Sequence, residues 1–187
     1  MLALAGTLLG CGGGGGGAAA TAAAAPAVPG ESTAPPDLTG VQLPDFVMPA
    51  IKGGVSRPNR KLTPGSVVTT DANTVCDTSD SSNAVSVTLQ TAVMQEYGYG
   101  ALPQDQHKYI LDYLIPIDLG GAATEANVWP AATRGAGFYQ KVQTDHILRE
   151  LVCRRSLSLT AAQDALEKDW YAAWLRYVVA TGAADSS

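Results

Sequence analysis

Residues 112–121 read DYLIPIDLGG and residues 126–130 read ANVWP, and these two neighbouring segments decide the fold. β-branched and aromatic residues lead into the first segment, which ends on a Gly-Gly pair, so a strand that stops in a turn is expected here. A second strand is expected around Val128 and Trp129, where apolar residues resume. The two segments therefore predict a strand, a turn and a second strand.

Helical patterns lie on both sides of these predicted strands. Apolar residues without internal Gly or Pro predict a helix over residues 87–97, which Gly98 ends at the C′ position. Residues 140–151 place their apolar side chains largely on one helical face. Further on, Thr160 is expected as an N-cap, with Gln163 completing a capping box. The long amphipathic helix that follows has an apolar stripe, most simply explained as core packing.

Composition divides the 187 residues into four parts. Residues 1–11 are expected to be a lipoprotein signal and lipobox, and residues 12–60 a low-complexity tether rich in Gly, Ala and Pro that stays disordered. Residues 61–180 are expected to form the folded domain, which opens with a turn at 63–65 and a short β-branched run, SVVTT, at 66–70. Residues 181–187 are expected to be a disordered tail.

The N-terminal residues resemble a bacterial secretion signal that ends in a lipobox. Residues 8–11 read LLGC, and the resemblance implies cleavage before Cys11 and attachment of lipid to its sulfur. The protein is then exported, periplasmic or at the cell surface, and anchored to a membrane that it does not cross. No Lys or Arg precedes the apolar run, so a low-complexity apolar tail remains the alternative.

The remaining cysteines form an even pair. If Cys11 carries lipid, Cys76 and Cys153 are left in an oxidising compartment, and a disulfide between them is the economical prediction. Such a bond would stabilise the fold by at most about 4–5 kcal/mol on the chain-entropy model. Two buried free thiols are the alternative.

The overall charge argues against strong nonspecific binding to nucleic acid. The net charge is −5 and the isoelectric point is about 4.8, so a nucleic-acid site would need a local basic patch. Lys141, Arg149, Arg154 and Arg155 are the only notable basic cluster. They are candidates for phosphate contacts, and a solvated helix face near an anionic membrane is the alternative.

The two central segments together resemble the signature of the HNH (ββα-metal) endonucleases. That signature has an acidic residue and a histidine, then two apolar residues and Pro, a Gly-Gly corner and an Asn-Leu-Trp-Pro segment. The resemblance extends over residues 62–174. Further matching residues follow the order that is found in an exported subgroup of the family. The further matches are Tyr97-Gly98, Lys141, Val152-Cys153, Ser158-Leu159, Ala162-Gln163 and Asp169-Trp170. It implies an α+β fold with a ββα-metal (HNH-like) core and flanking helices.

The resemblance also implies roles for individual residues in metal-assisted phosphodiester hydrolysis. Asp112 falls at a metal-ligand position, with a turn-capping carboxylate as the alternative, and Asn127 falls at the asparagine that braces the loop between the strands. Asp145 and His146 are the candidate metal ligands on the helix. Tyr113 stands at the general-base position, where the family has histidine.

A tyrosine is a poor general base. Its ordinary pKa of about 10 leaves on the order of 0.1% phenolate at neutral pH, and losing a general base costs roughly 10²–10⁴ in rate. Tyr113 is therefore either a weak base, assisted by a nearby cation, or a plain core residue.

Two functions follow from these residues. The first is an exported HNH-like endonuclease domain, weakened or inactive because of Tyr113, that acts on DNA or RNA with divalent Mg or Zn and needs no small-molecule cofactor. The second is a noncatalytic envelope lipoprotein that serves as a binding or structural module and has no cofactor. A toxin-like effector is a third, weaker possibility, and whether the chain is an enzyme stays open.

Overall fold

The computed structural model describes residues 36–41, 54–77, 83–99 and 108–182. The expected signal with Cys11, most of the expected tether and residues 183–187 of the expected tail lie outside the described residues. Within them the fold is mixed: helices accompany one small antiparallel sheet, which confirms the α+β class. No helix among the described residues is long and apolar enough to span a membrane.

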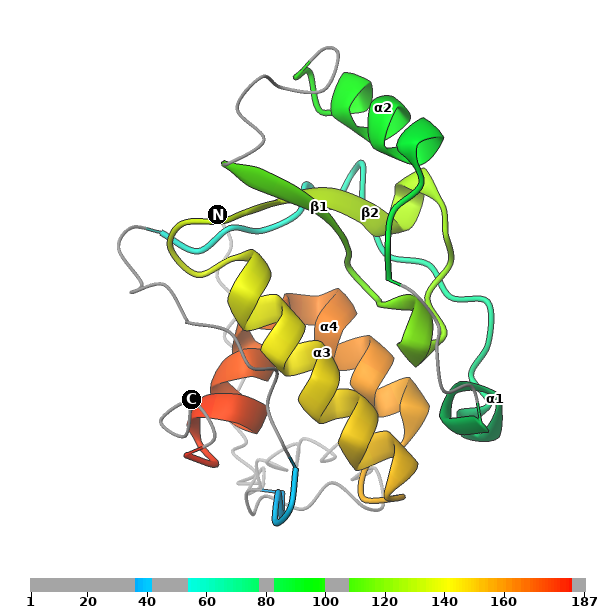
Figure 1. Cartoon of the computed structure of the whole chain (residues 1–187), viewed down its shortest axis with the longest axis vertical. Coiled ribbons are helices and arrows are strands. Elements are labelled where there is room, and N and C mark those ends of the chain that lie inside the picture. Colours follow the sequence, from blue (N-terminus) through cyan, green and yellow to red (C-terminus); the bar gives the residue numbers. More distant parts are fainter. Residues whose placement is uncertain (1–35, 42–53, 78–82, 100–107, 183–187) are drawn as a thin grey trace, which may run out of the picture. The chain divides into compact units, whose positions relative to one another are not determined.

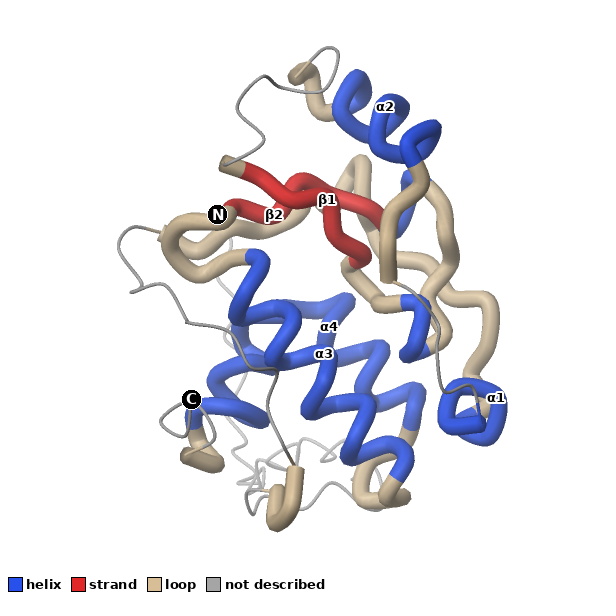
Figure 2. Tube along the Cα trace, viewed as in Figure 1, coloured by secondary structure: helices blue, strands red, loops and turns tan. Residues whose placement is uncertain are grey.

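The sheet consists of the two strands that the central segments predict. Strand β1 (Tyr109–Tyr113) runs antiparallel to strand β2 (Val128–Ala132), and the register places Tyr113 opposite Val128 (Figure 2). The prediction of two strands is confirmed. The β-branched run at 66–70 makes a single bridge, between Val67 and Gly121, and its Val68 is 74% exposed.

The connection between β1 and β2 depends on its two glycines. After a short 3₁₀ turn (Ile117–Leu119), Gly120 adopts a φ of 78°, a left-handed conformation that favours glycine. A side chain at Gly121 would overlap the backbone carbonyl of Ile115. Only glycine lets the chain turn back this closely toward β2.

Helix α3 (Phe138–Cys153) follows the sheet and contains the predicted helix over residues 140–151. It begins earlier than expected because the backbone N–H of Gly137 donates to Oε1 of Gln140 at 3.0 Å, which closes the first turn. Its C-cap is Arg154, and the next residue, Arg155, is left-handed with a φ of 61°.

Helix α4 (Leu159–Trp174) packs against α3. The expected N-cap at Thr160 is wrong: Ser158 caps the helix, because its Oγ accepts the Ala161 N–H at 3.1 Å. Gln163 serves another purpose, since its Nε2 donates to the carbonyls of Leu119 and Thr69 at 2.8 and 2.9 Å. It therefore ties α4 to the turn between the strands.

The end of α4 is not regular. Asp169 leaves helical geometry at φ −163° and ψ 98°, and its Oδ1 accepts the backbone N–H groups of Tyr171 and Ala172. Its carboxylate also pairs with Arg57 at 3.1 Å. A short π-helix (Leu175–Val179) follows α4 directly.

The sheet separates two clusters of buried side chains, with α2 (Val87–Glu96) on one side of it and α3 and α4 on the other (Figure 1). The larger cluster lies on the side of α3 and α4. It includes Trp129, Ile147, Leu148, Leu166 and Trp170. The apolar stripe of α4 is thus core, as predicted. The smaller cluster, under α2, contains Val85, Val93, Tyr113 and Val128.

Contacts of the domain begin before residue 61. Val55 bridges to Ala136, and the carbonyl of Ser56 accepts Nε1–H of Trp170 at 3.0 Å. Leu38 and Val41 pack against the larger cluster. The C-terminal boundary of the expected tether is therefore placed too late in the sequence, because some of the residues before it pack against the domain.

Candidate functional site

A pocket of about 630 Å³ lies between α2, β1 and α3. Its polar lining comes from Asn83, Gln90, Asp112, Asp118, Asp145 and His146. Its apolar lining includes Val85, Met94, Leu111, Phe138 and Val142. The fold thus brings the three predicted metal ligands to one pocket, although Asp112 lies on β1 and the other two on α3.

The ammonium group of Lys141 lies beside this pocket and is fully buried. Its Nζ is 2.6 and 2.8 Å from the two carboxylate oxygens of Asp145, one helical turn further along α3, and donates to the carbonyl of Tyr113 at 3.1 Å. Oδ2 of Asp112 lies 4.0 Å from the same Nζ. Lys141 is therefore the buried counter-ion of Asp112 and Asp145.

The carboxyl groups outnumber this counter-ion. Burial raises the pKa of Asp112 above its ordinary value, against the lowering effect of Lys141, and the pKa of Asp145 is raised well above its ordinary value in the same way. Burial also raises the pKa of Asp118, while a hydrogen bond with Asn83 and the charge of Arg149 lower it. The three carboxyl groups together therefore hold a proton to higher pH than free carboxyls would.

Two carboxylate oxygens at this site lack hydrogen-bond partners within the described part of the chain: Oδ2 of Asp112 and Oδ1 of Asp118. The Asp112 side chain is only 8% exposed. The other oxygen of Asp118 lies 3.8 Å from Nε of Arg149. Buried carboxylate oxygens without donors are costly, so this is the part of the pocket where a positively charged group would be most stabilised.

Asn127 joins the two ends of the connection between the strands. Its Oδ1 accepts the Ile115 N–H at 2.9 Å, and its Nδ2 donates to the carbonyls of Ile115 and Ala122 at 2.8 and 2.9 Å. The residue is completely buried. These contacts are those of a residue that braces the loop, as expected, and they give Asn127 no contact with the pocket.

Tyr113 is not among the residues that line the pocket. Side chains alternate along β1, so Asp112 faces α3 whereas Tyr113 enters the smaller cluster with Val85, Val93 and Val128. The residue is 2% exposed, and burial, followed by the charge of Asp112, raises the pKa of its phenol. Both effects decrease the phenolate fraction, opposite to what a general base requires.

The predicted metal ligands do not fit a divalent ion as a set. Both oxygens of Asp145 accept hydrogen bonds from Lys141, and the ammonium of that lysine lies 4.0 Å from Asp112. A metal between Asp112 and Asp145 would have to compete with a buried positive charge at hydrogen-bond distance. His146 is half-buried and lines the same pocket.

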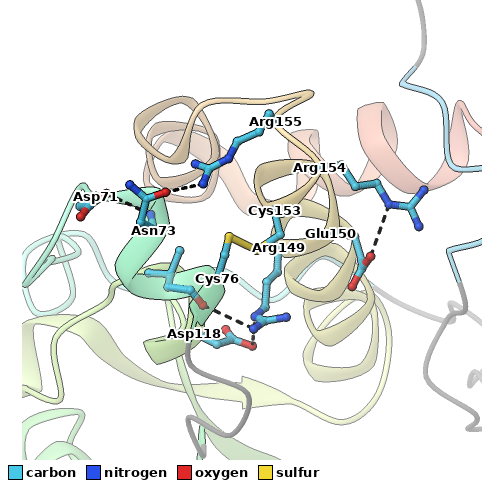
Figure 3. Close-up of a disulfide and its surroundings, with 10 residues drawn as sticks. Asp71, Asn73, Cys76, Asp118, Arg149, Glu150, Cys153, Arg154 and Arg155 are labelled. Carbon is cyan, nitrogen blue, oxygen red and sulfur yellow. Dashed lines mark hydrogen bonds and ion pairs between the residues drawn. A yellow bond between two sulfur atoms is a disulfide. The ribbon is translucent and has the colours of Figure 1, made fainter.

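The expected basic cluster is wrong in one member, because buried Lys141 cannot reach a phosphate in solution. The three arginines lie at the C-terminal end of α3 beside the disulfide (Figure 3). Arg149 pairs with Asp118, Arg154 with Glu150, and Arg155 donates to the side chain of Asn73. Most of this positive charge therefore faces groups within the domain.

The disulfide joins the two cysteines that remain once Cys11 is set aside as the expected site of lipid attachment. The sulfurs of Cys76 and Cys153 are 2.04 Å apart, so the bond links α1 (Ala72–Asp77) to the last residue of α3 (Figure 3).

Sequence reasoning missed Asp118 and Asn83 as pocket residues. Asp118 stands inside the central segment, just before its Gly-Gly pair, and its acidic character there was a usable signal. Asn83 accepts the Ile117 N–H at 2.8 Å. The two residues are far apart in the sequence, so no local pattern predicts this contact.

The fold and the site define an α+β domain with a small two-stranded sheet and an acidic, partly apolar pocket. Comparison with protein-family models, with curated proteins and with solved structures finds no match to this chain.

Proposed function

We propose that the chain is an exported envelope lipoprotein whose HNH-like domain has lost nuclease catalysis and serves as a binding module. The burial of Tyr113 carries this proposal. A general base must reach the attacking water, and this side chain is 2% exposed with a raised pKa. The HNH-like core itself is supported by the order of elements, in which β1, β2 and α3 follow one another and α3 contacts β1.

The buried ion pair supports the same function. Lys141 holds both oxygens of Asp145, so the helix that would supply metal ligands supplies a cation instead. The lipobox resemblance at Cys11 supports export and anchoring, and diacylglycerol on Cys11 in mass spectra of membrane fractions is the expected result. A mature N-terminus elsewhere would contradict it.

A weakened nuclease remains the second candidate, and one observation favours it. Asp112, Asp118 and His146 line one pocket, and oxygens of both carboxylates lack donors. A divalent ion bound there would act as a Lewis acid on a phosphodiester.

Plasmid cleavage by the full chain with Mg²⁺, Mn²⁺ or Zn²⁺ distinguishes the two functions. We expect no metal-dependent nicking by the parent or by Tyr113→His, because the new imidazole would lie in the smaller cluster and not in the pocket. A gain of 10²–10⁴ in nicking by Tyr113→His would contradict the proposal. So would parental nicking that Asp112→Ala abolishes.

A further inference from the structure

The pocket between α2, β1 and α3 carries an excess of negative charge. Three carboxylates face two cations, which leaves one formal negative charge when the histidine is counted as neutral. The carboxylates are Asp112, Asp118 and Asp145, the cations are Lys141 and Arg149, and the histidine is His146.

Asp112 is the carboxylate with the least compensation. Its side chain is 8% exposed, its Oδ2 has no hydrogen-bond donor within the described part of the chain, and the ammonium of Lys141 lies 4.0 Å away. A buried carboxylate in this state is stabilised strongly by a donor that carries a positive charge.

Apolar side chains line much of the rest of the pocket, which is too large for an ion alone. Val85 and Met94 line it from the side of α2, and Phe138 and Val142 line it from α3. Its volume of about 630 Å³ lies in the range of small-molecule sites, about 300–1,000 Å³. A bare metal ion would leave these apolar walls uncovered.

The geometry points to a binding site for a small organic monocation, a primary ammonium group on an apolar body. The ammonium would pair with Asp112, and the apolar body would cover the walls from α2 and α3. A single positive charge matches the single formal negative charge of the pocket. This inference rests on the proposed noncatalytic function and names the class of ligand that the module takes.

Benzylamine is a suitable probe, with benzyl alcohol as its neutral analogue of nearly the same shape. Titration into the full chain, followed through backbone amide resonances, is expected to give saturable shifts at β1 and α3. We expect a Kd of about 1 mM or tighter for the amine, as is ordinary for a ligand of this size. Benzyl alcohol should bind at least about 10-fold more weakly, since it cannot pair with a carboxylate.

Asp112→Asn tests the residue assignment because it keeps the shape of the side chain and removes its charge. We expect it to weaken benzylamine binding at least about 10-fold while the urea midpoint stays at or above that of the parent. Asp118→Asn is the second variant, with the same expected direction. Asp164→Asn is the matched control, since that carboxylate is 52% exposed on α4 and lies outside the pocket.

Several results would overturn the inference: no saturable benzylamine binding, equal affinity for benzyl alcohol, or unchanged affinity in folded Asp112→Asn. Binding of Mg²⁺ through Asp112 without binding of benzylamine would show that the pocket takes a metal ion and not an organic cation. If plasmid stays uncleaved in these cases, only the ligand class is wrong. Cleavage that depends on Asp112 would overturn the proposed function itself.

Discussion

Replacing Lys141 by methionine removes the buried ammonium and keeps most of the side-chain volume. Asp145 then loses both of its short hydrogen bonds, and the carbonyl of Tyr113 loses its donor. Breaking a buried ion pair by removing one partner costs about 3–5 kcal/mol, because the other charge stays buried without compensation. We therefore expect Lys141→Met to decrease the free energy of unfolding by that amount at pH 7.

The double variant Lys141→Met with Asp145→Leu separates the ion pair from the carbonyl. With Lys141 and Asp145 both replaced, two defects remain: the carbonyl of Tyr113 has no donor, at about 1–3 kcal/mol, and Asp112 has lost its counter-ion, as it also has in the single variant. The double variant should therefore be more stable than the single one, although it carries one more substitution. A double variant that is more stable than the single variant would show that the cost comes from an uncompensated charge and not from a simple packing defect.

The pH dependence of the single variant has a definite sign. Without Lys141 the pKa of Asp145, already raised by burial, rises further, so the folded state holds a proton that the unfolded state releases above about pH 4. Stability then increases as the pH falls from 7 toward 4, and the deficit relative to the parent shrinks.

Urea unfolding followed by tryptophan fluorescence measures these differences, since Trp129 and Trp170 are both 1% exposed. For an m-value of about 2 kcal/mol/M, the expected decrease at pH 7 is a midpoint shift of about 1.5–2.5 M. A decrease below about 1 kcal/mol, or one that is the same at pH 7 and pH 5, would refute the account of this ion pair.

Three further experiments test the fold. Asn127→Ala removes three hydrogen bonds from a fully buried position and should cost about 3 kcal/mol or more in urea unfolding; a cost under about 1 kcal/mol would show that water replaces them. The double substitution Cys76→Ala with Cys153→Ala opens a bond across a sequence separation of 77 residues and should decrease stability by about 4–5 kcal/mol on the chain-entropy model, with dithiothreitol on the parent as the control. Asp169→Ala removes the acceptor for two backbone N–H groups in α4 and should cost about 1 kcal/mol, whereas Asp164→Ala on the same helix should cost less than about 0.5 kcal/mol; equal effects would contradict the capping role.

The parts of the fold that local patterns encode were predictable. The two strands follow from β-branched and aromatic residues beside a Gly-Gly pair, and α3 and α4 follow from apolar spacing. The N-cap of α4 was missed by two residues because Ser158 and Thr160 are both residue types that cap helices. The β-branched run at 66–70 forms no strand, because β propensity takes effect only where a partner strand exists, and Val67 has a single bridge.

The sequence predicted several of the residues that line the site, but it did not predict how their side chains are arranged. Asp112, Asp145 and His146 do line one pocket, but sequence spacing does not show which groups a carboxylate pairs with. Lys141 was taken for a surface cation because lysine is rarely buried, and only the packing of α3 on β1 shows that its ammonium lies inside. Side chains alternate between the two faces of the sheet along β1, and this alternation determines on which face Tyr113 lies. The resemblance alone did not determine that face.

The bond between Cys76 and Cys153 closes a covalent ring that contains every residue lining the pocket, from Asn83 to His146. A protease that cuts one peptide bond between the two cysteines therefore releases no fragment. The two pieces remain one molecule until the disulfide is reduced, and their local concentration for re-forming the pocket stays high. In an oxidising compartment, a nicked domain of this kind would keep both walls of its binding site.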